Sequence, residues 1–366
     1  MRLLVVSTLG GIMVTAAGAG FAQDAEPSAG PKFKGYGWLN PAYLSFDDGQ
    51  ETKGVLVNNN NSIGRIGLWV DWTLDAASTL KFNIESNLGT RASNTVTMTT
   101  TPDAFDWSTQ DIRKLELIYG SGFGVLSAGQ GNMATDHVAE IDFSGTKLSG
   151  YSYYDALAGG FAFRNSDGSL SDVAVKKVFT NLELFRLWRL RYDTPEMSGF
   201  TASVAYGTDI LSQSETDSYY DAALRYDGTA GDFQIGAGLG YNVTQPESGE
   251  STENLTGSVA VLHTPTGLNG TIAAGSVMDG GSYYYLKASW IGDLVAAGQT
   301  AFAVEYYEST DIGVTDGGGT SWGIMVNQAL PHQIDAYAGY REYDLSQTGA
   351  SYMTASSYVI GVKWVF

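Results

Sequence analysis

The chain of 366 residues carries a formal net charge of −19 and contains no cysteine. Because nucleic-acid phosphates bind basic surfaces, this charge argues against nucleic acid as a partner, and the lack of cysteine excludes disulfide bonds as a source of stability. The 46 glycines and 22 tyrosines are typical of many tight turns and interfacial aromatic residues, whereas the mean hydropathy of −0.08 is too polar for a bundle of membrane-spanning helices.

The N-terminus has the form of an export signal. Arg2 precedes an apolar run over residues 3–14, and small residues lead up to Gln23. The apolar run is well short of the roughly 20 residues that span a bilayer, which argues against an uncleaved anchor. We therefore expect residues 1–22 to be a cleaved signal peptide and residues 23–366 to form the exported protein.

Beyond the signal, apolar and polar residues alternate in many segments bounded by Gly, Asp, Asn and Ser. A period of two between such turn residues indicates β-strands with one apolar face. The pattern predicts 16 strands, at residues 32–47, 62–75, 79–89, 105–120, 122–131, 184–194, 200–209, 218–228, 232–245, 254–264, 268–279, 282–295, 298–309, 319–331, 332–345 and 357–366.

The connections between these strands are of two alternating kinds. Short turns follow every even-numbered strand, and longer segments follow every odd one. An even number of strands with short turns on one side and long loops on the other is the layout of an outer-membrane β-barrel whose termini both lie in the periplasm. The sequence therefore predicts an all-β fold, a 16-stranded antiparallel transmembrane β-barrel.

Aromatic residues on the apolar parity support this prediction. One group lies beside the short turns: Trp72, Tyr119, Phe123, Tyr192, Phe200, Tyr226, Phe233, Trp290, Trp364 and Phe366. A second group lies at the opposite strand ends: Tyr206, Tyr241, Tyr306, Trp322, Tyr340 and Tyr358. Two aromatic belts indicate two water interfaces, which a soluble β-sandwich does not explain.

The last stretch, SYVIGVKWVF, presents one face made only of large apolar groups and ends at Phe366. We expect this strand to turn that face to lipid and to pair with the first strand, so that no open sheet edge meets hydrocarbon.

Charged residues fall on the opposite, inward parity. They are Arg65, Lys81, Glu85, Lys114, Glu116, Arg189, Arg191, Arg225, Lys287, Glu305, Arg341 and Lys363. A lumen with charges of both signs suits water, and 16 strands make a barrel wide enough for an aqueous channel. Arg189 and Arg191 share one face of a strand and need water or carboxylates between them.

The segment at residues 132–183 is far longer than an ordinary connection, which indicates a functional loop. It begins with GNMATDHVAEIDFSGT and so offers Asp136, His137, Glu140 and Asp142.

The stretches RYDTPEMSGF and GQGNMATDHVAEIDFSGT, together with the C-terminal strand, resemble the general porins of Gram-negative bacteria, particularly those of alphaproteobacteria. The Pro-Glu-Phe-Gly-Gly motif of enterobacterial members is absent from the loop, which is also longer here. The resemblance implies that the third loop folds into the barrel and that its carboxylates face arginines on the wall. Asp136, Glu140 and Asp142 would form the acidic side of this constriction, and Arg65, Arg189 and Arg191 the basic side.

The resemblance also implies an outer-membrane homotrimer in contact with lipid that admits ions and small hydrophilic solutes. A terminal aromatic such as Phe366 resembles the signal read by the barrel-assembly machinery. A channel selective for one nutrient stays open as an alternative, since both kinds of channel share a fold.

Other chemistry has weaker support in the sequence. Asp167 and Asp172 in the long loop are weak candidate Ca²⁺ ligands, since they match no full ligand pattern and a polar loop tip explains them better, and no other cofactor is expected. His137 and Ser144 lie close in sequence, but no nucleophile, base and acid are assembled as a hydrolase requires, so we expect no enzyme. An adhesin would need larger external domains than these loops provide.

Overall fold

The computed structural model describes residues 30–212 and 217–366, so the expected signal peptide at residues 1–22 lies outside the described residues. Two short helices, α1 (Asp155–Ala158) and α2 (Val175–Val178), and three 3-10 turns, η1 (Asn60–Ser62), η2 (Ser93–Thr95) and η3 (Thr109–Asp111), accompany the strands. Among the described residues, no helix has both the length and the apolar character to cross a membrane.

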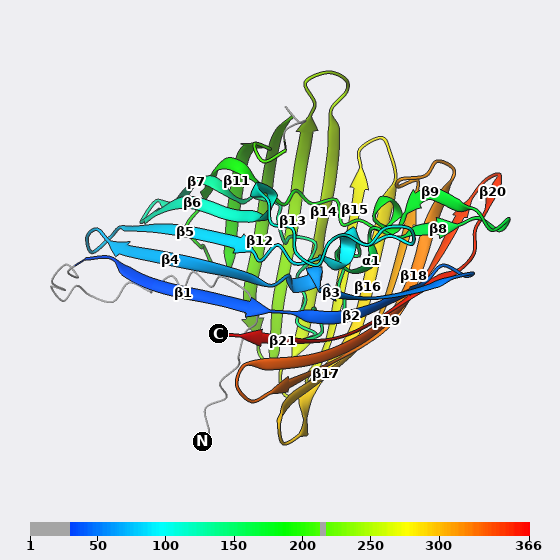
Figure 1. Cartoon of the computed structure of the whole chain (residues 1–366). Coiled ribbons are helices and arrows are strands. Elements are labelled where there is room, and N and C mark those ends of the chain that lie inside the picture. The colour runs from blue at the N-terminus through cyan, green and yellow to red at the C-terminus, as the bar shows by residue number, and fades with distance from the viewer. Residues whose placement is uncertain (1–29, 213–216) are drawn as a thin grey trace.

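The strands form one antiparallel sheet that closes into a barrel (Figure 1). Its members are β1 (Lys32–Leu39), β2 (Pro41–Asp47), β3 (Thr52–Asn58), β4 (Arg65–Thr73), β5 (Thr79–Asn87), β6 (Ile112–Ser121), β7 (Gly124–Asn132), β10 (Arg186–Asp193), β11 (Phe200–Thr208), β12 (Ser218–Ala230), β13 (Phe233–Gln245), β14 (Thr252–His263), β15 (Leu268–Val277), β16 (Ser282–Val295), β17 (Gly298–Thr310), β18 (Gly317–Leu330), β19 (Ile334–Gln347), β20 (Ala350–Ser351) and β21 (Ala355–Val365).

The predicted barrel of 16 strands is confirmed. β1 and β2 together form the first wall strand, β3 and β4 form the second, and the two-residue β20 belongs to a connection. Closure follows the expected pairing of the two ends, because β21 bonds to β1 at Trp38 and to β2 over residues 42–47. The last residue, Phe366, bonds to Gly37 through both backbone groups.

Side chains alternate between the two faces of the wall as the period predicted. Outward residues such as Leu239, Val259 and Ile272 are exposed, whereas inward Glu305 and Arg341 are buried. This is the reverse of a water-soluble protein, and it fits a wall that meets lipid outside and polar groups inside.

Aromatic side chains meet in pairs on the outward face near the strand ends. Phe200 and Tyr226, with ring centroids 4.8 Å apart, lie beside a short turn, and Tyr340 and Tyr358, also 4.8 Å apart, lie near the opposite end. These two pairs therefore lie where the sequence placed the two groups of aromatic residues.

The second wall strand begins earlier than predicted. Residues 52–58, expected in a loop, form β3 and pair with β2. Val55 and Val57 are buried while Leu56 is exposed, so β3 has the period of a strand. A short interruption at residues 59–64, which begins with three asparagines, separates β3 from β4.

The fourth wall strand begins later than predicted, at Ile112 instead of residue 105. The 3-10 turn η3 precedes it and is held by a capping box between Ser108 and Asp111. The alternating Phe105 and Trp107, which suggested a strand, are exposed. A local cap therefore overrides the apolar period here.

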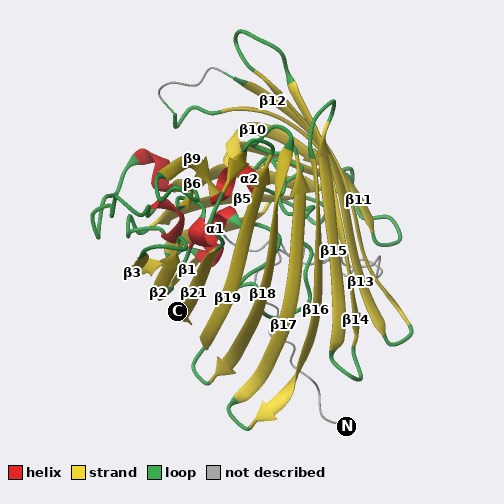
Figure 2. Cartoon of the chain, turned by 90° about the vertical axis from the view of Figure 1, so that its right-hand side faces the viewer, coloured by secondary structure: helices red, strands yellow, loops and turns green. Residues whose placement is uncertain are grey.

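The wall is not of even height. β5, β6, β7, β10 and β11 have 8 to 10 residues, whereas β16, β18 and β19 have 14. Figure 1 shows β12–β14 rising above β4–β7, and Figure 2 shows the long strands from β14 to β19 side by side and tilted.

The segment between β7 and β10, residues 133–185, is called L3 below. It contains α1, the hairpin of β8 (Ala162–Arg164) and β9 (Leu170–Ala174), and α2. Its backbone accepts or donates hydrogen bonds with inward residues of five long strands, which are Asp221 on β12, Ser258 on β14, Lys287 on β16, Tyr307 on β17 and Arg341 on β19. L3 therefore lies inside the barrel against its taller side.

An apolar core fixes L3 to that side. Tyr154 packs 4.9 Å from Tyr307 between ring centroids, and Phe161 stacks on Phe46 at 4.3 Å. At the top of the hairpin, the Arg164 Nη2 lies 2.7 Å from the Asp48 carboxylate, which ties L3 to the connection between β2 and β3. Close packing of this kind makes L3 part of the folded barrel instead of a free loop.

Candidate constriction site

The first residues of L3 are fixed to β12. The backbone N–H and the hydroxyl of Thr135 donate to the Asp221 carboxylate at 2.7 and 2.8 Å. Arg225 Nη2 donates to the backbone carbonyls of Ala134 and Asp136, both at 2.7 Å. These bonds hold the chain so that the next residue, His137, stands at a tight bend called the L3 tip (residues 136–140).

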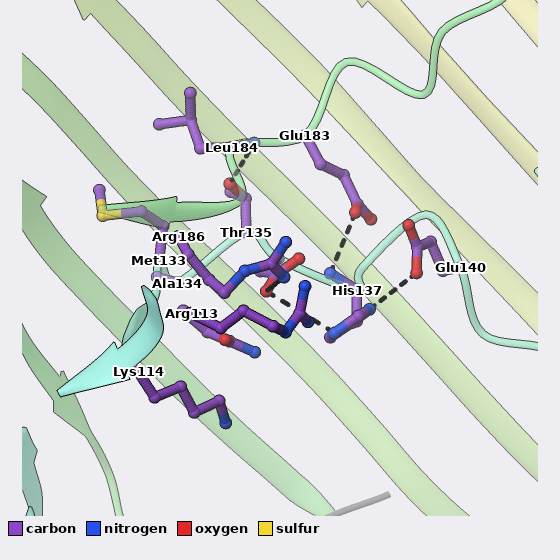
Figure 3. Close-up of polar contacts among 12 residues, drawn as sticks. Arg113, Lys114, Met133, Ala134, Thr135, His137, Glu140, Glu183, Leu184 and Arg186 are labelled. Carbon is purple, nitrogen blue, oxygen red and sulfur yellow. Dashed lines mark hydrogen bonds and ion pairs between the residues drawn. The ribbon is translucent and has the colours of Figure 1, made fainter. Parts of the chain in front are cut away.

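Three acidic side chains contact His137, and Figure 3 shows two of them, Glu140 and Glu183, beside it. The His137 Nδ1 lies 2.7 Å from Glu140 Oε2, and its Nε2 lies 3.6 Å from Asp136 Oδ2. The backbone N–H groups of His137 and Ala139 both donate to Glu183, which holds His137 at its positive φ of 71°. A non-glycine residue in that region needs such support.

The third acid, Glu183, has an unusual protonation equilibrium. Burial, followed by the charges of Glu140 and Asp136, raises the pKa of Glu183 well above its ordinary value, against the lowering effect of the two N–H donors. Three carboxyl groups in one site repel one another when all are ionised, so protonation of Glu183 reduces the electrostatic repulsion around the L3 tip.

Four basic side chains, called the wall cluster, lie near the L3 tip. They are Arg65 on β4, Arg113 and Lys114 on β6, and Arg186 on β10. Glu85 Oε1 accepts from Arg65 Nη1 at 3.1 Å and from Arg113 Nε at 2.8 Å. Arg186 Nη1 lies 3.9 Å from Asp136 Oδ2, and this contact joins the wall cluster to the L3 tip.

The site is accessible at its centre. The His137 side chain is 56% exposed, while the wall cluster side chains are between 12 and 24% exposed. Charges that are partly shielded from water act on one another and on a nearby solute more strongly than charges in bulk water.

The predicted basic residues separate in the structure. Arg65 belongs to the wall cluster, but Arg189 is buried against Glu116 and donates to the Asn132 carbonyl at 3.1 Å. Arg191 pairs with Asp193 at 2.7 Å and donates to the Met133 carbonyl at 2.7 Å. Both arginines hold the start of L3, and their role in solute passage stays a prediction.

The predicted acidic residues separate as well. Asp136 and Glu140 lie at the L3 tip, whereas Asp142 forms a buried ion pair with Lys287 on β16 at 2.8 Å. Burial opposes ionisation, but the ammonium groups of Lys287 and Lys147 hold the pKa of Asp142 below its ordinary value. The structure thus brings Arg65, Asp136 and Glu140 to one site and places Asp142, by its ion pair with Lys287, against the inner face of β16.

Arg113 was not among the inward residues expected from the sequence. On a regular strand Arg113 and Lys114 would face opposite sides, but the pairing of β5 with β6 shifts register at Glu85 and leaves Arg113 as the extra residue of a bulge. A bulge re-aims a side chain, so both cations reach the lumen. The signal in the sequence was two successive charges in an otherwise alternating strand.

The candidate Ca²⁺ ligands lie at the outer hairpin of L3. Asp167 and Asp172 are exposed, and Asp167 Oδ1 accepts from the backbone and hydroxyl of Ser169, which lowers its pKa. Throughout residues 30–212 and 217–366, no group of three or more His, Cys, Asp or Glu is arranged to hold a metal ion. Ca²⁺ binding there stays a prediction.

The serine and histidine considered for a hydrolase have separate partners. The Ser144 hydroxyl forms a hydrogen bond with the Thr146 hydroxyl, and His137 Nδ1 forms one with Glu140.

A closed barrel with an apolar outside, a charged inside and a loop folded against its inner wall defines the class of outer-membrane channel proteins. Within that class, the chain belongs to the Gram-negative porin family, which matches residues 10–348. The predicted resemblance to these porins and the predicted channel function in the outer membrane are thereby confirmed.

Solved structures share the fold at low sequence identity. An anion-selective porin from Comamonas acidovorans is 15% identical with a TM-score of 0.60, over 92% of this chain and 100% of that chain. The outer membrane channel DcaP of Acinetobacter baumannii is 12% identical with a TM-score of 0.56, over 95% and 100%. A mutant of the Rh. blastica porin is 14% identical with a TM-score of 0.54, over 92% and 100%. No curated protein sequence matches the chain.

Proposed function

We propose that this porin is a general diffusion channel for ions and small hydrophilic solutes, and that solutes pass along the exposed side of His137, where the L3 tip meets the wall cluster. The contact of Asp136 with Arg186 carries this proposal, since it sets loop carboxylates against wall cations at the exposed His137. Fixed charges of both signs beside a narrow aqueous path sort solutes by charge and size.

The residues of this constriction differ in part from those that the sequence suggested. Arg65, Arg113, Lys114 and Arg186 would form its basic side, and Asp136 and Glu140 its acidic side. Arg189, Arg191 and Asp142 would position L3, because each is held by a partner on the wall or at the start of the loop.

A nutrient-selective channel is the second candidate. The inward aromatic Trp38 favours it, because its ring lies 4.5 Å from the charged ends of both Arg65 and Lys363. An aromatic group beside cations is a common element of solute recognition. The two candidates differ in kinetics, since a selective channel saturates with its solute and a diffusion channel does not.

Assembly and export belong to the same proposal. Cleavage of residues 1–22, recognition of Phe366 by the barrel-assembly machinery and association into a homotrimer in outer-membrane lipid are expected. A trimer form is recorded for OmpT, an outer membrane protein of Vibrio cholerae with the same fold and 16% identity. No catalytic activity is part of the proposal, and neither is a cofactor. Crosslinking in native membranes should give a three-subunit species.

The chain has no cysteine, so one introduced thiol can test the constriction. We expect His137→Cys to conduct in a planar bilayer and to lose most of its conductance when a bulky thiol reagent is added. Asp167→Cys on the exposed outer hairpin is the matched control and should lose little. Equal effects at both positions would contradict a constriction at the L3 tip.

A further inference from the structure

The ring of His137 lies between two carboxylates of its own loop. Its Nδ1 is 2.7 Å from Glu140 Oε2, and its Nε2 is 3.6 Å from Asp136 Oδ2. The side chains of Glu140 and Asp136 are 4% and 0% exposed, whereas that of His137 is 56% exposed. The L3 tip therefore presents its histidine to water and keeps the two acids from it.

Both contacts of the ring are satisfied by one protonation state of the imidazole. A neutral histidine has one N–H donor and one nitrogen lone pair. The short contact to Glu140 requires the N–H on Nδ1, which would direct the lone pair of Nε2 toward Asp136. The imidazolium ion carries donors on both nitrogens, so it suits both acids.

Asp136 lacks any closer partner for its charge. Its side chain is fully buried, and neither of its carboxylate oxygens has a hydrogen-bond partner among the described residues. Its contacts with cationic groups are Arg186 Nη1 at 3.9 Å and His137 Nε2 at 3.6 Å. A buried carboxylate without a compensating charge is costly, so Asp136 favours the charged form of His137.

Other groups near the ring act in both directions. Glu183, which binds the His137 backbone N–H, is held neutral by burial and by its acidic neighbours, and burial raises the pKa of Tyr151 and Tyr153 near Glu140, so these hydroxyls stay neutral as well. The basic groups are the wall cluster (Arg65, Arg113, Lys114 and Arg186), Arg225 on β12, which donates to the Asp136 carbonyl, and Lys147 in L3, which donates to the Glu140 carbonyl. These cations oppose protonation of the ring, whereas the two acids in contact with it favour protonation.

We propose that His137 is a specificity-determining residue of the channel, an imidazolium held between Asp136 and Glu140 whose loss of a proton shifts ion selectivity toward cations. This inference rests on the proposed function, since it requires solutes to pass the exposed side of His137. Loss of the proton leaves both acids of the L3 tip without the charge between them. Histidine is the side chain that ordinarily changes charge between about pH 5 and about pH 8, so selectivity would depend on pH near neutrality.

The test is the reversal potential of the purified porin in a planar bilayer under a KCl gradient. Measurements at about pH 5.5 and about pH 8 stay above the range in which ordinary carboxyl groups titrate. As pH rises between these values, the permeability ratio of chloride to potassium should fall about twofold or more, which is the effect of one unit charge on an ion a few ångströms away in water.

Two variants of His137 separate its charge from its shape. His137→Asn stays neutral and accepts the positive φ of 71°, so it should show the cation-shifted value at both pH values. His137→Lys keeps a positive charge throughout and should show the anion-shifted value at both. A heat-dependent shift on a gel checks that each variant is folded.

Two further variants test other sources of a pH effect. His332→Asn is the matched control, because His332 is another of the 3 histidines, has a positive φ of 65° and lies in the exposed turn between β18 and β19. Glu183→Gln removes the neighbouring carboxyl group of L3. Both should keep the full dependence on pH.

The outcomes are distinct. A conducting channel whose reversal potential is the same at both pH values overturns the role of His137 and leaves the proposed function standing. The same follows if His137→Asn keeps the dependence or if Glu183→Gln abolishes it. A folded protein that passes no current overturns the proposed function itself.

Discussion

Several inward charges of this barrel have partners that determine what their loss would do. Arg189 is an example, since it lies on the parity of a pore-lining residue but its guanidinium is buried between Glu116 and the carbonyls at the end of β7. Parity predicts which face a side chain takes, but it does not predict whether that face is open or covered. In the loop, the Glu140 and Asp142 side chains are both buried, and their partners distinguish them, since Glu140 pairs with the exposed His137 and Asp142 with Lys287 on β16.

Arg189→Gln is expected to destabilise the folded barrel by about 3 to 5 kcal/mol, because Glu116 would keep a buried charge without its partner. The temperature at which the folded band disappears from a gel should fall. Lys32→Gln, at an exposed strand end, is the control and should leave it unchanged. The double variant Arg189→Gln with Glu116→Gln should recover part of the loss. Equal transition temperatures for Arg189→Gln and the unaltered protein would show that the pair does not hold L3.

Glu140→Gln and Asp142→Asn should have different effects, although the two residues are neighbours in one loop. Glu140 lies at the L3 tip, so its loss should shift a salt-gradient reversal potential toward anions. Asp142 is already neutralised by Lys287, so its loss should mainly lower the thermal stability. If Asp142→Asn shifts selectivity as much as Glu140→Gln, Asp142 must face the solute path.

At the scale of elements, the sequence predicted the wall better than the loop. The period of two depends on neighbours along one strand, so it located strands such as β13 and β16 to within a few residues. The period gave the wrong strand start in two places, where the capped turn η3 precedes β6 and where the interruption at η1 precedes β4. The path of L3 could not be predicted, because it depends on contacts such as Thr135 with Asp221 that no periodicity encodes. Composition and resemblance indicated which side chains could form the site, and the bulge at Arg113 adds a cation that the strand period does not predict.

L3 should be held less firmly as pH rises. The pKa of Glu183 is higher in the folded protein than in the unfolded chain, so its stabilising contribution is complete below the ordinary glutamate pKa and is lost as pH rises through the folded value. Thermal unfolding followed by circular dichroism between about pH 5 and about pH 9 should show a falling midpoint. Glu183→Gln stays neutral and should flatten this dependence. A midpoint that falls equally in both proteins would assign the effect to other groups.

At the scale of the whole molecule, the outward face of the wall is apolar and the charged wall residues point inward, so the fold is stable only where hydrocarbon replaces water. Backbone groups in hydrocarbon have no other partner than the next strand, which makes an interrupted ladder costly. The closing strand β21 is the most sensitive place, since it bonds to β19 on one side and to β1 and β2 on the other.

Ile360→Pro should prevent closure of the barrel. Proline removes a backbone donor, and with it a ladder hydrogen bond, from the middle of β21, and within sheets it is found essentially only on edge strands or at bulges. The purified variant should lack the compact band that migrates differently before and after boiling, whereas the unaltered protein should show it together with a β-rich circular dichroism spectrum. Glu250→Pro, in the exposed connection after β13, is the control and should fold. Normal folding of Ile360→Pro would mean that closure does not depend on this ladder.

The contacts of L3 also determine when the barrel can finish folding. The Leu148 carbonyl accepts from Asn59, 89 residues earlier, and the Tyr151 carbonyl accepts from Arg341, 190 residues later. The Asn59 side chain also donates to the Tyr337 hydroxyl, 278 residues later in the chain. L3 therefore contacts an early and a late part of the chain at one place. Contacts that distant lose chain entropy before they yield any stabilisation, which makes their formation slow. L3 can therefore reach its folded position only after the last strands are available for pairing. While a ribosome or translocation pore still holds the C-terminus, the channel cannot complete its folding.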